Sequence, residues 1–187
     1  MALLSQTKKL SSVFRTFSTS KSSPSIGGHL LSLKNGPPPA LALGAAGLIP
    51  FMSAPAYIVQ MGEYCPIIGQ AQLAYGAVIL SFLGGVRWGK LVLPGTSLSP
   101  SWNQYIWSVT PSLIAWPALM MPSLPAADLT IVAGLGACCY LDLQQSAYAP
   151  WFKGLRIVLT AVAIISLLTT LALSFILEPK KKEENEQ

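Results

Sequence analysis

The sequence of 187 residues is 52% hydrophobic and only 10% charged, whereas an ordinary soluble domain has about 25% charged residues. This composition excludes a water-exposed globular surface and indicates a membrane protein. Five basic residues precede Glu63, the first acidic residue. This distribution indicates that the net charge of +5 serves targeting and membrane orientation. We therefore expect no nucleic-acid partner.

Residues 1–17 are expected to form a mitochondrial presequence. The segment is rich in Ser, Lys and Arg and lacks Asp and Glu, which is the composition of an organellar transit peptide. On a helix, Leu10 and Phe17 fall on one side, with Lys8 and Arg15 on the other. The residues up to Ser18 resemble a matrix-protease cleavage site. Two alternatives stay open: Phe17 begins a removable octapeptide, or the segment is an uncleaved basic tail.

Residues 18–39 contain many turn-forming residues and little periodicity, and they end in three consecutive prolines. This pattern predicts a flexible linker on the matrix side of the membrane.

Five segments that follow the linker are long and apolar enough to cross a bilayer, whose core of about 30 Å needs roughly 20 mostly apolar residues. They are residues 40–60, 67–86, 102–121, 126–143 and 155–177. The expected fold class is therefore all-α: a multi-pass transmembrane helical bundle of about five spans over residues 40–178, followed by a charged tail over residues 179–187.

The basic residues between the spans predict an orientation, because Lys and Arg concentrate on the side from which segments are not translocated. They occur in the linker, in the loop after the second span and in the loop after the fourth. The loops after the first and third spans contain none. The N-terminus is therefore expected in the matrix and the C-terminus in the intermembrane space, although the three lysines of the tail do not follow this pattern.

The second span ends in the densest pattern of the chain. Ser81, Gly85 and Gly89 recur at every fourth position, and such spacing allows another helix backbone to approach closely. Arg87 and Trp88 lie within the same segment. One hypothesis is a binding site built around Arg87, and the other is a tightly packed helix end with an arginine that extends to the interface.

Asp142 ends the fourth span on the same expected side of the membrane as Arg87 and Arg156. An ion pair with either arginine would offset the cost of holding a carboxylate near the hydrocarbon. Together with Trp88 and Trp151, two aromatic residues expected at headgroup level, these residues predict a binding or structural cluster at the matrix-side interface.

Catalytic and metal-binding patterns were not found in the sequence. Cys65, Cys138 and Cys139 have no metal-ligand spacing, and the single His29 lies far from them. There are no paired carboxylates, no nucleophile beside a histidine and no phosphate-binding glycine loop. We therefore expect no enzyme activity, no metal and no cofactor. Four glutamines are expected to hydrogen-bond between helices or at the interface: Gln70, Gln72, Gln144 and Gln145.

Several runs of residues resemble a known family typified by transmembrane protein sixty-nine. The matching parts are residues 47–51, 75–89 and 110–116, with Asp142, Pro150, Trp151 and Arg156. The resemblance covers residues 40–177 and implies a multi-pass fold and a mitochondrial location, but the family has no established activity to carry over.

Two functions are expected from these observations. The leading one is a non-enzymatic mitochondrial inner-membrane protein that packs against, or helps to assemble, a larger membrane complex, with the lipid bilayer and other inner-membrane proteins as partners. The alternative is a small oligomeric transporter or channel. It rests on the proline pairs of the first and third spans, Pro50 with Pro55 and Pro111 with Pro117, since interrupted helices can mark a transport site.

Overall fold

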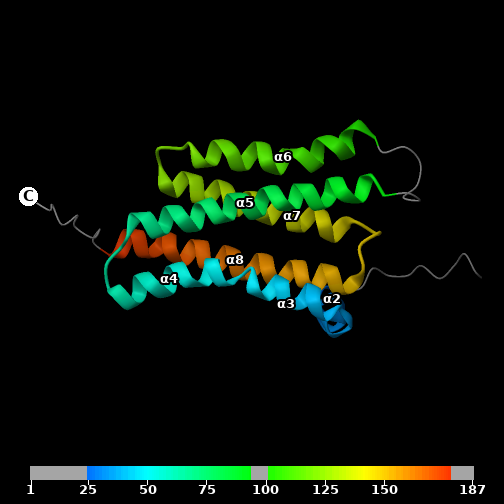
Figure 1. Cartoon of the computed structure of the whole chain (residues 1–187), viewed down its shortest axis with the longest axis horizontal. Helices are drawn as coiled ribbons and strands as arrows, with labels where there is room; N and C mark the ends of the chain where they lie inside the picture. Colours follow the sequence, from blue (N-terminus) through cyan, green and yellow to red (C-terminus); the bar gives the residue numbers. More distant parts are fainter. Residues whose placement is uncertain (1–24, 94–100, 178–187) are drawn as a thin grey trace, which may run out of the picture.

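The computed structural model describes residues 25–93 and 101–177, and this part of the chain is all-α. Its elements are α2 (Ile26–Leu31), the 3-10 helix η1 (Ser32–Asn35), α3 (Pro38–Ala46), α4 (Ile49–Met61), α5 (Pro66–Leu91), α6 (Trp102–Leu119), α7 (Leu124–Gln144) and α8 (Pro150–Ile176). The long helices run side by side in alternating directions, with α6 at one edge of the bundle and α3 and α4 at the other (Figure 1). The expected presequence and charged tail lie outside the described residues.

Four stretches of described helix are long and apolar enough to cross a membrane: Pro38–Met61, Pro66–Leu91, Leu124–Gln144 and Pro150–Ile176. They confirm an all-α multi-pass bundle. The expected span at residues 102–121 corresponds to α6, which is less apolar because its first turn contains Asn103 and Gln104. α6 packs against α5 and α7.

The first expected span is divided into α3 and α4 at Gly47 and Leu48. Pro50 has no backbone N–H, so it cannot complete the helical hydrogen bond that would continue α3. The hydroxyl of Tyr75 donates to the carbonyl oxygen of Gly47 at 2.9 Å. A side chain from α5 therefore partners a backbone group at the break.

Pro55 leaves a second carbonyl, that of Phe51, without a helical donor. The side-chain amide of Gln72 donates to this carbonyl at 2.8 Å, and the hydroxyl of Ser166 donates to it as well. The prediction that Gln72 hydrogen-bonds between helices is confirmed. These contacts join α4, α5 and α8 at one buried point.

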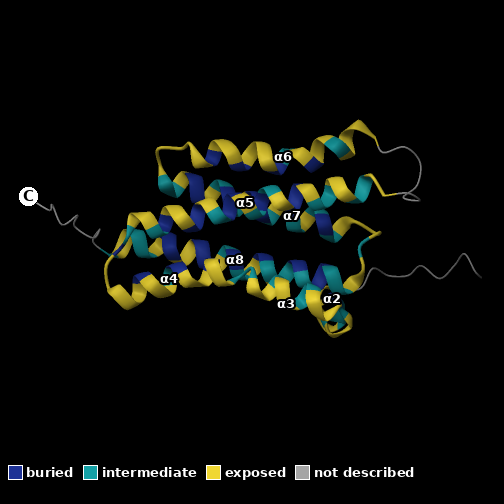
Figure 2. Cartoon of the chain, in the orientation of Figure 1, coloured by how far each residue is buried: buried dark blue, intermediate teal, exposed yellow. Residues whose placement is uncertain are grey.

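Glycines allow the closest helix contacts of the core. A Cβ at Gly84 of α5 would collide with the backbone carbonyl oxygen of Ser108 in α6, and a Cβ at Gly134 of α7 would meet the side chain of Leu80. Buried residues line the inward faces of the helices, whereas the outer faces are largely exposed and apolar (Figure 2). This distribution is that of a bundle surrounded by lipid.

The described part of the segment expected to be a flexible linker is helical. α2 and η1 pack against α8, and the backbone of His29 lies where a Cβ at Gly154 would be. The prolines expected to break the chain instead begin α3, because proline is well tolerated in the first helical turn. The folded domain therefore begins before residue 40.

Candidate functional site

Three charged side chains from three helices meet at one end of the bundle. Nε of Arg87 donates to Oδ1 of Asp142 at 3.1 Å, and Nε of Arg156 donates to Oδ2 of the same carboxylate at 2.9 Å. Asp142 and Arg156 are buried, and the Arg87 side chain is only 11% exposed. The ion pair expected between Asp142 and one arginine is thus a cluster with both, which we call the arginine cluster.

The helix ends explain how the arginine cluster is held. Asp142 lies in the last turn of α7, where the helix dipole disfavours a negative charge. Arg87 and Arg156 offset this effect. Nζ of Lys153 donates to the carbonyl oxygen of Leu143 at 2.7 Å and so partners one of the carbonyls left free at the end of α7.

The described charges separate between the two ends of the bundle. We call the end where α5 and α7 stop and α8 begins the charged end. All the described lysines and arginines lie there: Lys34, Arg87, Lys90, Lys153 and Arg156. Asp142 is the one acidic residue at this end among the described residues, because Glu63 and Asp128 lie at the opposite end. The charged end therefore has a clear excess of positive charge.

The arginine cluster itself contains two cations and one carboxylate. Within residues 25–93 and 101–177, the Nη2 atoms of Arg87 and Arg156 are buried and have no hydrogen-bond partner. A buried donor without a partner costs free energy, and more when it is charged. The arginine cluster can therefore accept a further anionic or strongly polar group.

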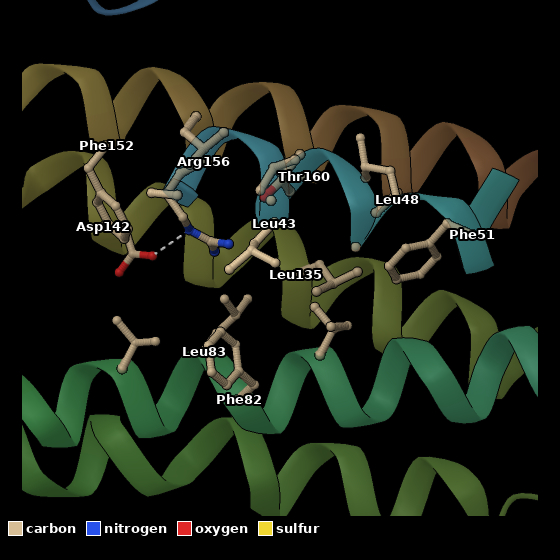
Figure 3. Close-up of a pocket in the computed structure, with 18 of the residues that line it drawn as sticks. Leu43, Leu48, Phe51, Phe82, Leu83, Leu135, Asp142, Phe152, Arg156 and Thr160 are labelled. Atoms are coloured by element: carbon tan, nitrogen blue, oxygen red, sulfur yellow. Dashed lines mark hydrogen bonds and ion pairs between the residues drawn. The ribbon is translucent and has the colours of Figure 1, made fainter. Parts of the chain in front are cut away.

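An apolar cavity of about 360 Å³ lies beside Arg156, between α3, α4, α5, α7 and α8. Its wall consists mainly of aliphatic and aromatic side chains, among them Leu43, Leu48, Phe51, Phe82, Leu83, Leu135 and Leu159. Asp142 and Arg156 form its charged end, and the guanidinium group of Arg156 points toward the centre of the cavity (Figure 3). We call this space the Arg156 cavity.

A second, more polar cavity of about 190 Å³ is lined by Arg87 together with residues of α5, α6 and α7 and the loop before α8. Nζ of Lys90 lies 4.2 Å from the ring centroid of Tyr148 in this loop, which is a cation–π contact. Burial raises the pKa of Tyr148, and the charge of Asp142 raises it further against the opposing effect of the arginines. The phenol therefore remains protonated at neutral pH.

The two tryptophans of the expected site lie near the arginine cluster but outside it. Trp88 is 45% exposed and packs edge-on against Tyr105 of α6, with ring centroids 4.9 Å apart. Trp151 lines the Arg156 cavity and contacts Phe152. The structure thus brings Arg87, Asp142 and Arg156 together and places the tryptophans around them.

Of the three expected helix-packing residues, Gly85 and Gly89 face outward and Ser81 is half-buried. Gly85 and Gly89 are exposed, and a Cβ at either would meet no described atom within 4 Å. The hydroxyl of Ser81 donates to the carbonyl oxygen of Ala77 in its own helix. The contact with α6 is made instead by Gly84, a residue that sequence reasoning missed although it lies beside Gly85.

Sequence reasoning also missed a buried acidic group at the opposite end of the bundle. Asp128, in the first turns of α7, is only 3% exposed, and its Oδ1 has no partner among the described residues. Burial raises the pKa of the nearby Tyr64, and the charge of Asp128 raises it further. The described residues contain no group of three or more His, Cys, Asp or Glu side chains that could hold a metal ion.

Comparison with known proteins places this architecture in a family. A family model described as protein of unknown function (DUF3429) matches residues 36–172, which include the whole arginine cluster. Transmembrane protein 69 of Xenopus tropicalis is 46% identical over 142 residues, covering 75% of this chain and 56% of the relative. Transmembrane protein 69 of Mus musculus is 39% identical over 150 residues, covering 79% of this chain and 61% of the relative.

The chain thus matches little more than half the length of these curated relatives. No solved structure matches it. The apolar helices and the relatives together confirm the resemblance found in the sequence: the chain is a multi-pass membrane protein that belongs to the family of transmembrane protein 69, described as DUF3429.

Proposed function

We propose that this protein is a non-enzymatic component of the mitochondrial inner membrane that packs against a larger membrane complex and helps to assemble it. The observation that carries the proposal is an exposed strip of α5 formed by Val78, Phe82, Gly85 and Gly89, which we call the α5 outer face. Its two glycines leave the helix backbone open. A helix of another protein can therefore approach it closely.

The composition of α6, which packs against α5, supports a protein partner. α6 is not among the four described stretches that are long and apolar enough to cross a membrane, and Trp102, Trp107 and Trp116 are all exposed on it. Aromatic side chains are enriched in the buried centres of protein interfaces. A partner that covers α6 would shield its polar positions from lipid.

The distribution of charge supports the proposed orientation. Every described lysine and arginine lies at the charged end, and basic residues concentrate on the side of a membrane from which segments are not translocated. In a mitochondrion this side is the matrix. The N-terminal composition of residues 1–17 supports the same location.

The charged groups of the site support a structural role over a catalytic one. Both oxygens of Asp142 accept bonds from arginines, so this carboxylate is committed to holding α5, α7 and α8 together. The transporter alternative remains a prediction. The carbonyl of Phe51, which Pro55 leaves without a helical donor, is bonded by Gln72 and Ser166, and the carbonyl of Gly47 at the break before α4 is bonded by Tyr75, so these groups are committed to contacts between helices.

Photo-crosslinking in intact mitochondria tests the α5 outer face directly. A benzoylphenylalanine residue would replace Phe82, which is 63% exposed on this face, or as a control Tyr140, which is 63% exposed on α7. Both replacements exchange one exposed aromatic ring for another. We expect a discrete protein crosslink from position 82 and none from position 140. Identical patterns from the two positions would contradict docking through this face.

A further inference from the structure

The lining of the Arg156 cavity extends along α8 over about half the thickness of a bilayer core. Its lining extends along α8 from Trp151 near the charged end to Ala163, and twelve helical steps correspond to about 18 Å. Half of a bilayer core is about 15 Å thick. The cavity therefore runs from the interface to mid-membrane, parallel to the chains of a single leaflet.

The wall of the Arg156 cavity borders the surrounding lipid. Leu43 and Phe82 line it and are 73% and 63% exposed, respectively. A molecule can therefore enter from the membrane between α3 and α5. An apolar wall of this kind suits an acyl chain, and its volume of about 360 Å³ is within the usual range of ligand pockets, about 300 to 1,000 Å³.

The positive charge of Arg156 in the Arg156 cavity favours the binding of an anion. Arg156 is 6% exposed and its guanidinium points into the cavity (Figure 3). Its Nη2 has no partner among the described residues, and Asp142 is already shared with Arg87. A phosphate oxygen is a strong acceptor for a guanidinium N–H. It would also reduce the excess positive charge at this end of the bundle.

We propose that the Arg156 cavity binds one acyl chain of an anionic phospholipid, whose phosphate lies at the charged end beside Arg156. A neutral phospholipid would fill the apolar part but leave the positive charge uncompensated. A soluble anion would lack the chain that the apolar wall accommodates. Basic pockets between transmembrane helices are a general means of binding acidic headgroups. This site shares Phe82 with the α5 outer face, but Arg156 and Gly44 belong to the Arg156 cavity alone, and Gly85 and Gly89 belong to the α5 outer face alone.

Native mass spectrometry of the purified full-length protein tests the proposal. The protein is released from nanodiscs that contain phosphatidylcholine and phosphatidylglycerol in equal amounts. We expect a single retained phosphatidylglycerol per chain and little retained phosphatidylcholine. Equal retention of the two lipids, or none, would overturn the proposal. In a separate arm with added palmitate, displacement of phosphatidylglycerol by palmitate would overturn the headgroup assignment.

Two variants locate the site. Arg156→Gln removes the charge, and Gly44→Leu fills part of the cavity, because Gly44 lines it and the nearest neighbours of a Cβ there are Leu155 and Leu159 of its wall. Both should lose the retained phosphatidylglycerol severalfold. Gly44→Leu keeps the arginine cluster intact, so it decides the outcome even where Arg156→Gln does not fold. Retention by a folded Gly44→Leu protein would overturn the placement.

Gly85→Leu is the matched glycine-to-leucine control. Gly85 lies outside the Arg156 cavity and has open space around it. The Gly85→Leu protein should retain phosphatidylglycerol as the wild type does, even though the substitution is expected to weaken docking to a partner protein. The lipid site and the proposed function can therefore fail independently of each other. Loss of the lipid from Gly85→Leu would contradict the placement in the Arg156 cavity.

Discussion

Asp142 uses its two carboxylate oxygens to hold arginines from two other helices. The cost of placing these charges in a low-dielectric environment is large, and their mutual attraction offsets only part of it. The arrangement is therefore sensitive to loss of one member. Removing the carboxylate would leave two buried guanidinium groups without their shared counter-charge.

Asp142→Asn should therefore destabilise the fold by about 3 to 5 kcal/mol, the usual cost of breaking a buried ion pair from one side. The measurement is the thermal midpoint of the purified protein in detergent, together with its abundance in the membrane. Glu63→Gln is a suitable control because Glu63 is an exposed acidic residue at the other end of the bundle. Equal stability of the two variants would show that the arginine cluster contributes little.

For single residues, the sequence predicts the depth of a side chain in the membrane better than it predicts which other side chains it contacts. Asp142, Arg87 and Arg156 lie at the ends of apolar runs, and this position alone places them at one level in the membrane. The lateral arrangement of the helices decides that both arginines reach the same carboxylate. In the same way, a pattern of small residues does not distinguish Gly84, which contacts α6, from Gly85, which faces outward, because the two glycines are adjacent in the same apolar run.

Pro55, inside α4, shows how a helix with an internal proline remains stable in lipid. Each proline removes one backbone donor, and the released carbonyl must find another partner because no water is present in the hydrocarbon. For Phe51 these partners are Gln72 and Ser166. A polar side chain in α5 thus compensates for a proline in α4.

This compensation predicts a coupling between two positions. Gln72→Leu should cost about 1 to 3 kcal/mol, because the variant removes a buried hydrogen bond. Pro55→Ala restores the backbone donor to the carbonyl of Phe51. The cost of Gln72→Leu should therefore be smaller in the Pro55→Ala background. A double-mutant cycle on thermal midpoints measures this difference, and strictly additive effects would contradict the coupling.

Apolar runs predict most helix positions within a few residues, since the length of a span is set by the membrane. The apolar runs do not predict the helices at the N-terminal side of the bundle. The described linker residues form α2 and η1 because Gly154 lets the chain lie close to α8, a tertiary contact that local composition does not reveal. The expected span at residues 102–121 is a helix, α6 (Trp102–Leu119), although it is not among the four stretches that are long and apolar enough to cross a membrane.

Residues 25–93 and 101–177 have opposite charge character at the two ends of the bundle. The described cations and the arginine cluster occupy one end, while Glu63 and Asp128 occupy the other. With the α3–α4 stretch, α5, α6, α7 and α8 each crossing once, the two ends of the chain would lie on opposite sides of the membrane. The proposed orientation then places the C-terminus in the intermembrane space.

A C-terminal epitope tag tests this orientation. In mitoplasts, whose outer membrane is opened, external protease should remove the tag, because the C-terminus is expected outside the inner membrane. In intact mitochondria the tag should be protected, which serves as the control. A tag that stays protected in mitoplasts until detergent is added would place the C-terminus in the matrix and contradict this orientation. With the N-terminus also in the matrix, the number of crossings would be even, and α6 would be the first helix to reassign.

The central claim is that the α5 outer face binds a larger complex. The most direct measurement is a mild-detergent native gel of mitochondria that contain the wild type, the double variant Gly85→Leu with Gly89→Leu, or Ala137→Leu. Ala137 is exposed on α7, so its variant adds similar bulk to a different lipid-facing surface. We predict that the wild type and Ala137→Leu migrate with a large complex, whereas the double variant migrates alone at normal abundance. Migration of the double variant with the same complex, or of the wild type as a small free oligomer, would contradict it.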